Sequence, residues 1–218
     1  MWGIRLKAIC PSGDHTPNQP LVIIPQLGQR GPLGRCRSNV PTPISHAAVG
    51  FAVAAWTQHG VATRRVCIVA AACAVLPDMD VIGWLLHVSN ASPFGHRAIT
   101  HSLAFALVGA VVATIVFFPG NQWTRGRARI ALILGLALVS HACLDALSTY
   151  SVGVEFFAPF SQRRFRFPWT PLGVPNGSLV GQIVQEAVFV LLPAVLVGWL
   201  GIRTRRRDSG LTAPRVSP

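Results

Sequence analysis

The chain has 218 residues, of which 51% are hydrophobic and only 12% are charged. This balance argues against a soluble protein and predicts a single domain embedded in a membrane. The formal net charge of +12 does not indicate nucleic-acid binding, because the arginines lie in short clusters between and after apolar runs. We therefore expect membrane lipid as a partner, and no nucleic acid.

The first 39 residues contain Pro, Gly and scattered Arg, and their one apolar cluster, LVII, is far too short for a signal peptide. We interpret residues 1–39 as a disordered extension, or as sequence upstream of a true translation start near Val40. Five cysteines occur without CxxC spacing. Cys67, Cys73 and Cys143 lie in apolar stretches and are expected to be buried as small hydrophobic residues.

Apolar segments follow in chain order. Those at 44–56 and 66–76 are short and predict a hairpin that barely crosses the roughly 30 Å hydrocarbon layer, or a re-entrant pair. The segments at 98–118, 130–150 and 178–202 are each long enough to span that layer. The predicted fold class is therefore all-α, a multi-pass transmembrane helical bundle with about four to five helices.

The domain organisation follows from these segments. Residues 40–202 form the membrane-embedded domain, and 203–218 form a basic tail that we expect to be disordered and cytoplasmic. If successive helices alternate in direction, the arginine clusters at 64–65, 125–129 and 203–207 share one side, which the positive-inside rule makes cytoplasmic. The three arginines at 163, 164 and 166 fall on the other side and count against this orientation.

Polar residues that are rare in membrane interiors recur at one end of these segments. Because antiparallel segments place alternate ends together, these polar residues should all gather at one membrane face. With the cytoplasmic side assigned as above, this face is the non-cytoplasmic one. The residues are His46, Asp78, Asp80, His96, His101, His141, Asp145 and Glu186.

The spacing of these residues adds detail. His141 and Asp145 are four apart and share one side of a helix, so one metal can take both. Pro77 should break the helix ahead of Asp78, and in the extended or turn backbone that follows, Asp78 and Asp80 can both face one ion.

Clustered carboxylates in lipid need a compensating partner, because each costs about 2.5–3.5 kcal/mol on insertion scales. A divalent metal supplies it. Imidazoles and carboxylates without thiolates favour zinc, with manganese or iron as alternatives, over calcium. A single tetrahedral ion takes four ligands, and the candidate residues outnumber that. Either two metals bind here, or some of the residues support the ligands without touching the ion.

The motifs PTPISHAAVG, LPDMD, FGHRAITHS, HACLDALSTYSVGVEFFAPF and RRFRFPW, in this order, resemble those of the LexA-regulated, membrane-bound, metal-dependent hydrolases of the bacterial inner membrane. The resemblance runs from about residue 41 to 186 and implies a multi-pass inner-membrane hydrolase. It implies metal-site roles for His46, Asp78, Asp80, His96, His101, His141 and Asp145. The H-x-x-x-D element is also similar to that of zinc-dependent phospholipase C and single-strand nucleases, which points to a phosphoester substrate.

The leading hypothesis is a membrane hydrolase that activates water with one or two divalent ions, for a phosphoester such as a phospholipid or a lipid-linked phosphate. Asp80 or Glu186 is expected to accept the proton of the water, and Arg97 to bind the developing negative charge. The alternatives are a divalent metal-ion transporter and a scaffold with a structural metal. Clustering at one interface, without an internal repeat, argues against a transporter.

Overall fold

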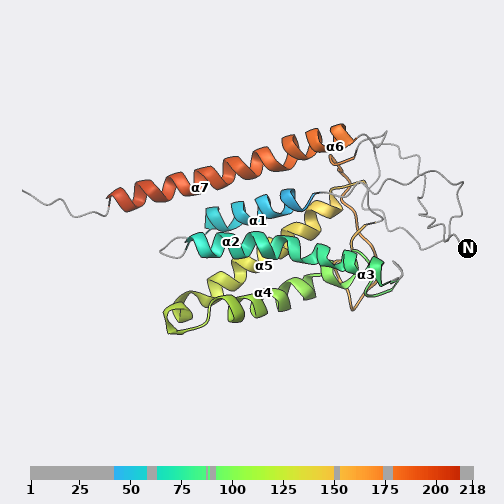
Figure 1. Cartoon of the computed structure of the whole chain (residues 1–218), viewed down its shortest axis with the longest axis horizontal. Coiled ribbons are helices and arrows are strands. Elements are labelled where there is room, and N and C mark those ends of the chain that lie inside the picture. The colour runs from blue at the N-terminus through green and yellow to red at the C-terminus, as the bar shows by residue number, and fades with distance from the viewer. Residues whose placement is uncertain are drawn as a thin grey trace, which may run out of the picture.

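The architecture is a set of packed helices, seen in a computed structural model that describes residues 42–57, 63–86, 88, 92–149, 153–173 and 179–211 (Figure 1). The predicted N-terminal extension at 1–39 lies outside the described residues. In chain order the elements are α1 (Pro43–Thr57), α2 (Thr63–Val75), η1 (Leu76–Val81), α3 (Ile82–Leu85), η2 (Ile99–His101), α4 (Leu103–Phe117), η3 (Asn121–Gly126), α5 (Arg127–Ala146), α6 (Leu179–Glu186), the π-helical η4 (Ala187–Leu191) and α7 (Leu192–Leu211).

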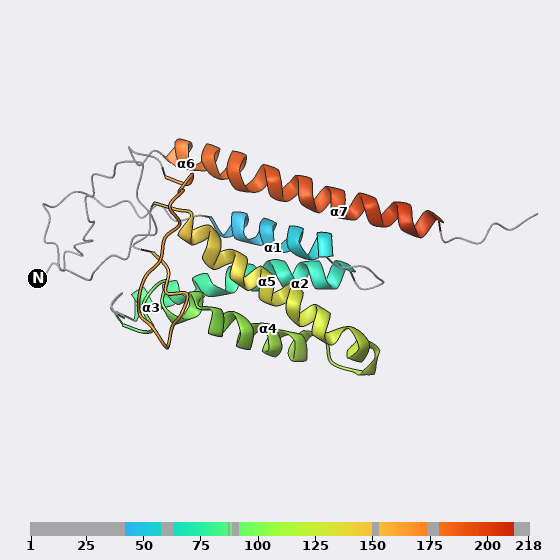
Figure 2. The same cartoon turned by 180° about the vertical axis from the view of Figure 1, so that it is seen from behind.

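The prediction of an all-α protein is confirmed. Across the described ranges the chain forms no β-strand, and its extended pairing is limited to two isolated bridges, Ser148 with Leu172 and Val154 with Phe165. Both bridges involve residues 153–173, the crossing segment, which runs across one end of the helices (Figures 1 and 2). Backbone hydrogen bonds fix it there, from Leu103 N to Phe156 O at 2.9 Å and from Phe167 N to Ala146 O at 3.0 Å.

Small residues allow α1 to lie very close to its neighbours. A Cβ atom built on Gly50 would lie 2.5 Å from the Cβ of Ala74 and 2.6 Å from the carbonyl oxygen of Ala70, so only glycine fits where α1 meets α2. Gly201 of α7 similarly lies against the backbone of Ala55. The contact at Gly50 brings α1 close to the last residues of α2, and the contact at Gly201 brings α7 close to the end of α1.

The buried core lies between α1, α2, α4 and α5 and is rich in alanine. Cys67 and Cys73 are buried in it, as expected, and Cys143 is half-buried. The outward face of α4 is instead strongly apolar and exposed, with Leu107 at 69% and Val108 at 62%. Such a face is unusual for a soluble protein and suits contact with lipid.

Two helical stretches, Asn121–Ala146 and Leu179–Thr204, are long and apolar enough to cross a membrane by length and composition. The expected span at 98–118 is wrong in its start, because α4 begins at Leu103. Ser102 has an extended backbone, and its hydroxyl accepts a hydrogen bond from Phe105 N at 3.1 Å, which caps the helix there. Residues 96–101 are consequently free to form a compact turn that carries polar side chains.

The chain differs from prediction at two further places. Residues 76–81 form a regular 3₁₀ helix, where extended or turn backbone was expected. The disordered tail was expected to begin at residue 203, but α7 continues to Leu211. Residues 212–218 lie outside the described part of the chain. Arginine has a high helix propensity, so the run after Ile202 can continue the helix.

Candidate metal centre

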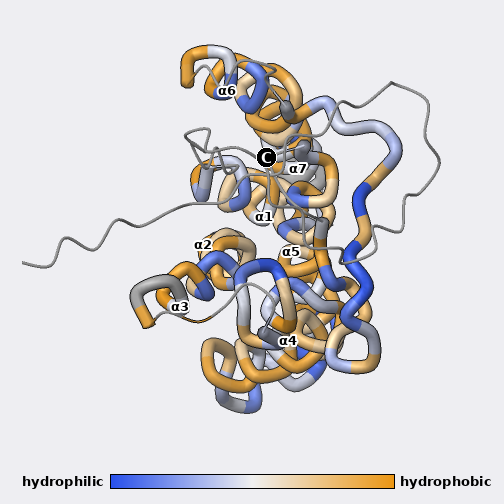
Figure 3. The backbone as a smooth tube through the Cα atoms, turned by 90° about the vertical axis from the view of Figure 1, so that its right-hand side faces the viewer, coloured by the Kyte–Doolittle hydropathy of each residue, from blue (hydrophilic) through white to orange (hydrophobic). Residues whose placement is uncertain are grey.

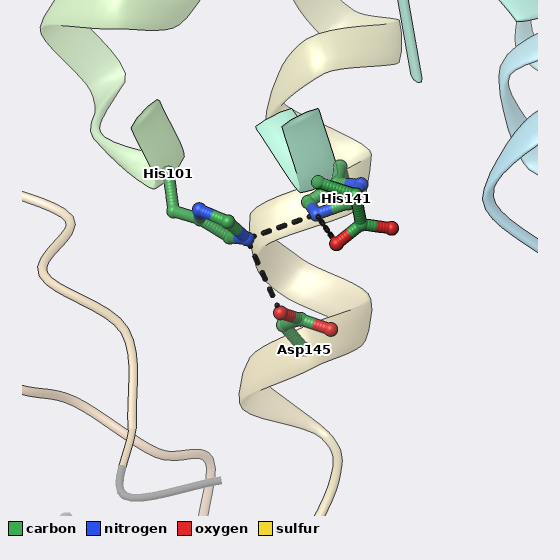
Figure 4. Close-up of side chains that lie close together, drawn as sticks. His101, His141 and Asp145 are labelled. Atoms are coloured by element: carbon green, nitrogen blue, oxygen red, sulfur yellow. Dashed lines mark hydrogen bonds and ion pairs between the residues drawn. The ribbon is translucent and has the colours of Figure 1, made fainter. Parts of the chain in front are cut away.

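Helix α5 presents His141 and Asp145 one turn apart on its buried face, and both side chains are fully buried (Figure 4). This arrangement follows from their spacing of four residues. His101, at the end of η2, points toward them. Its Nε2 lies 3.0 Å from Nε2 of His141 and 3.3 Å from Oδ2 of Asp145. The helical spacing of the sequence therefore brings His141 and Asp145 together, and the turn before α4 adds His101.

Asp78 completes what we call the central group, defined as Asp78, His101, His141 and Asp145. Its Oδ1 lies 3.4 Å from Nε2 of His141. One ligand atom from each of the four residues lies within 4.8 Å of all the others, so the group could hold a metal ion. Two nitrogen and two oxygen donors are a set that suits zinc and other divalent transition metals.

Hydrogen bonds at the other ring nitrogens indicate which tautomers are present. Nδ1 of His141 lies 2.7 Å from the carbonyl oxygen of Ala74, which only accepts, so Nδ1 carries a hydrogen. Nδ1 of His101 lies 3.3 Å from Oδ2 of Asp80, again an acceptor when ionised. When both rings are neutral and carry their hydrogen on Nδ1, their Nε2 lone pairs face each other, an arrangement that requires either a shared proton or a cation.

Asp80 supports the central group from outside it. Besides His101, its carboxylate contacts Nδ1 of His96 at 2.6 Å, the amide of Arg97 at 3.1 Å and the hydroxyl of Thr100 at 2.7 Å. Burial raises the pKa of Asp80, but the hydrogen bonds from His101 and His96 outweigh it and hold the pKa well below its usual range. Asp80 therefore stays ionised and orients His101, in the manner of carboxylates behind metal-binding histidines.

Asp78 and Asp80 were expected to face one ion together. They do not, because a 3₁₀ helix turns about 120° per residue, so positions two apart point in different directions. Asp78 contacts His141, and Asp80 contacts His96 and His101.

His46 lies beside the central group. Its ring stacks on that of His141 with centroids 3.9 Å apart, and its Nε2 lies 3.7 Å from Oδ1 of Asp145. The side chain is fully buried, and within the described residues neither ring nitrogen has a hydrogen-bond partner. Since buried imidazole nitrogens are almost always satisfied, His46 fits the predicted role of a further metal ligand.

Arg97 is buried, with 4% of its surface exposed, and its Nε lies 2.7 Å from Oδ2 of Asp145. Its backbone has φ of 65°, a left-handed conformation that is uncommon for a residue other than glycine. Two contacts hold this conformation, since its amide donates to Asp80 and its carbonyl accepts from Glu155 N at 3.2 Å. Strain maintained from both sides is typical of functional sites.

Glu186 lies apart from the central group. Its Oε2 accepts hydrogen bonds from the amide and hydroxyl of Thr42 at 3.0 and 2.6 Å and from the hydroxyl of Ser45 at 2.7 Å, while Oε1 accepts from Gln182 at 3.0 Å. The carboxylate thus ties α6 to the first residues of α1. It positions the turn that carries His46, and its predicted catalytic role stays a prediction.

Several contacts at the centre were not expected from the sequence. The carbonyl of Ala74 gives no signal, because every residue has one. Arg164 and Glu155 form a buried ion pair, with Nε and Oε1 3.0 Å apart. Their spacing in the chain is not a helical one, so the sequence pattern does not predict the pair. Thr100 stands within the FGHRAITHS motif, and its place between the two histidines was the available clue.

Together these observations define an all-helical protein with two candidate membrane spans and a buried group of His and Asp residues that could hold a metal ion. Residues 42–208 match the YdjM inner membrane protein family. The chain is also similar to the inner membrane protein YbcI of Escherichia coli (strain K12), with 36% identity over 178 residues that cover 76% of this chain and 100% of that protein.

The chain therefore belongs to the YdjM inner membrane protein family, and both matches support a location in the bacterial inner membrane. No solved structure matches it.

Proposed function

We propose that this protein is a multi-pass inner-membrane hydrolase that uses one or two divalent ions, zinc first among them, to cleave a phosphoester such as a phospholipid or a lipid-linked phosphate. The observation that carries the proposal is the pair of Nε2 atoms of His101 and His141, buried 3.0 Å apart between Asp78 and Asp145. A divalent ion held there supplies Lewis-acid polarisation of the ester and lowers the pKa of water toward neutrality.

The residues of the chain divide the remaining work. Asp78, His101, His141 and Asp145 hold the ion, and His46 adds a donor from α1. Asp80 fixes the ring of His101 and contacts His96 at 2.6 Å. Because the ionised Asp80 holds Nδ1 of His96, we propose that His96 takes the proton of the attacking water and that Asp80 stabilises the imidazolium that forms.

The orientation of the site is part of the proposal. The arginine clusters near 64–65 and 125–129 lie at the ends of α2 and α5 that are remote from the central group, which favours a non-cytoplasmic site. Among the three arginines that count against this orientation, Arg164 is buried and paired with Glu155.

Access from lipid supports a lipid-borne substrate. The crossing segment lies at the same end of the helices as the central group and exposes Phe157 at 51%, Phe160 at 89% and Trp169 at 66%. Tryptophan favours the membrane–water interface, so an exposed Trp169 suits headgroup depth. Figure 3 shows this end of the molecule, where hydrophilic and hydrophobic stretches of backbone lie side by side.

The test is turnover by the full-length protein purified in detergent. Phosphate or headgroup release from a phospholipid mixture should require a divalent metal and stop with a chelator. Asp145→Asn should abolish release, while Glu155→Gln, which removes a buried carboxylate outside the central group, should retain metal. Metal-independent release, or none with any metal, would contradict the proposal.

The transporter alternative makes a different prediction in the same preparation. Protein reconstituted into vesicles should take up the ion without any hydrolysis if the central group is a transport site. Uptake without hydrolysis would replace our proposal.

A further inference from the structure

An unused hydrogen-bond donor stands beside the central group. The Nε and Nη2 groups form one edge of the guanidinium of Arg97, and Nε contacts Asp145 Oδ2 at 2.7 Å. Nη2 is buried and has no hydrogen-bond partner in the part of the chain that the structure describes. A buried charged donor without an acceptor is costly, so an oxyanion placed there would be strongly favoured.

The backbone holds Arg97 in this position from two sides. Its amide donates to Oδ2 of Asp80 at 3.1 Å, and its carbonyl accepts from the amide of Glu155 at 3.2 Å. The guanidinium is therefore preorganised beside the metal ligands, and an anion that binds it also lies beside the metal site.

A second guanidinium, Arg166, lies close by on the crossing segment. Backbone hydrogen bonds fix both of its neighbours in the chain. Phe165 exchanges hydrogen bonds of 2.9 and 2.8 Å with Val154, and the amide of Phe167 donates to the carbonyl of Ala146, the residue after Asp145. Burial, and then the positive charge of Arg97, lower the pKa of Arg166. The two cations thus lie close enough to repel each other, and an anion between them relieves that repulsion.

We propose that Arg97 and Arg166 form a clamp for the terminal phosphate of a phosphomonoester, with its remaining oxygen directed at the central group. A phosphomonoester has three non-ester oxygens, one for each guanidinium and one for the metal site, whereas a diester has two. Arginine forks match phosphate geometry well. This inference rests on the proposed function and narrows its substrate to a lipid or soluble molecule with a terminal phosphate.

The test measures inorganic phosphate binding by calorimetry with the zinc-loaded, full-length protein in detergent. Arg166→Gln should weaken phosphate binding about tenfold or more, since a hydrogen bond to a charged group is worth about 1.5–3 kcal/mol. Arg163→Gln, which removes the same charge from an exposed position on the same segment, should change it less than about twofold. Arg97→Lys tests the other half of the clamp, and melting temperatures check that each variant is folded.

Each outcome bears on the clamp. Equal binding by the Arg166→Gln and Arg163→Gln variants, or no phosphate binding by the wild type, would overturn it. Binding of dimethyl phosphate as tight as that of phosphate would overturn the choice of a monoester. Phosphate binding that depends on Arg166, without any ester hydrolysis, would sustain the clamp and remove the proposed function.

The source of the phosphate is decided by a second pair of probes. Vesicles of phosphatidylcholine with and without phosphatidic acid test a lipid-borne phosphate, and glycerol phosphate tests a soluble one. Competition with inorganic phosphate by either probe supports the clamp and names the source; competition by neither would overturn it.

Discussion

His101 and His141 face each other through their Nε2 atoms at 3.0 Å, although 39 residues separate them in the chain. Each ring is anchored at its opposite nitrogen, His141 to the carbonyl of Ala74 and His101 to the carboxylate of Asp80. Two ring nitrogens held this close need a shared proton or a cation between them. The predictions below follow from that relationship and from the packing that maintains it.

Metal content should depend on the central group. His141→Ala and Asp145→Asn should each purify with much less metal than the wild type, because the first removes a nitrogen donor from the set of four and the second removes the negative charge of an oxygen donor. Glu155→Gln is the control, as it alters a buried carboxylate that pairs with Arg164 outside the group. Elemental analysis of the purified proteins measures the outcome. Equal metal in all four proteins would rule out a metal site here.

A structural role for the metal predicts something different for the same variant. If the ion only stabilises the fold, His141→Ala should fail to accumulate in the membrane. If the ion serves a reaction, His141→Ala should be expressed and folded but inactive. Membrane-fraction yield and a melting curve in detergent distinguish these results.

Asp80→Asn should weaken metal binding without abolishing it. Asp80 contacts His101 and His96, so its loss leaves the donors in place but less well oriented, and we expect metal affinity to fall about 10–100-fold. Asp78→Asn removes a member of the central group and should have the larger effect. Competition with a chromogenic chelator gives both affinities. An Asp80→Asn effect larger than that of Asp78→Asn would contradict the division of roles.

Metal affinity should fall as the solution is acidified. Imidazole must be neutral to bind a metal, so protons compete with the ion for the histidine ligands and lower metal affinity at low pH. Metal affinity should therefore rise as the pH is raised from acidic values. Chelator competition across this range provides the measurement, and an affinity that is independent of pH would exclude histidine ligation.

Gly50→Ala should destabilise the protein. The added methyl would meet Ala74 and the backbone of Ala70 at 2.5–2.6 Å, and overpacking of this kind costs about 1–3 kcal/mol. Gly126→Ala is the matched control, since nothing lies within 4 Å of its added methyl. Thermal unfolding in detergent should show a lower melting temperature for the first variant alone. Similar melting temperatures for both would mean that α1 and α2 approach less closely than described.

Glu186→Gln should destabilise the start of α1. The substitution keeps the shape but loses charge-assisted hydrogen bonds from Thr42 and Ser45, worth about 1–3 kcal/mol. A double-mutant cycle with Ser45→Ala should show coupling, because the two groups are in contact. If Glu186 is instead the catalytic base, its variant should keep the melting temperature and lose turnover.

The sequence by itself determined the all-helical fold and much of the composition of the centre. The helical period places His141 and Asp145 on one face, and the alternation of apolar segments brings the polar ends together. Both inferences depend only on local periodicity and chain direction. That is why His46, His96 and His101 could be assigned to the same end of the molecule before their contacts were known.

Tertiary structure decided how the gathered residues divide their roles. The 3₁₀ turn after Pro77 separates Asp78 from Asp80, and a left-handed backbone at Arg97 turns its guanidinium onto Asp145. Glu186 contacts the start of α1 because α6, which carries Glu186, lies beside α1 there. These contacts depend on side-chain directions set by packing between distant segments, and a linear pattern of residue types carries no information about those directions.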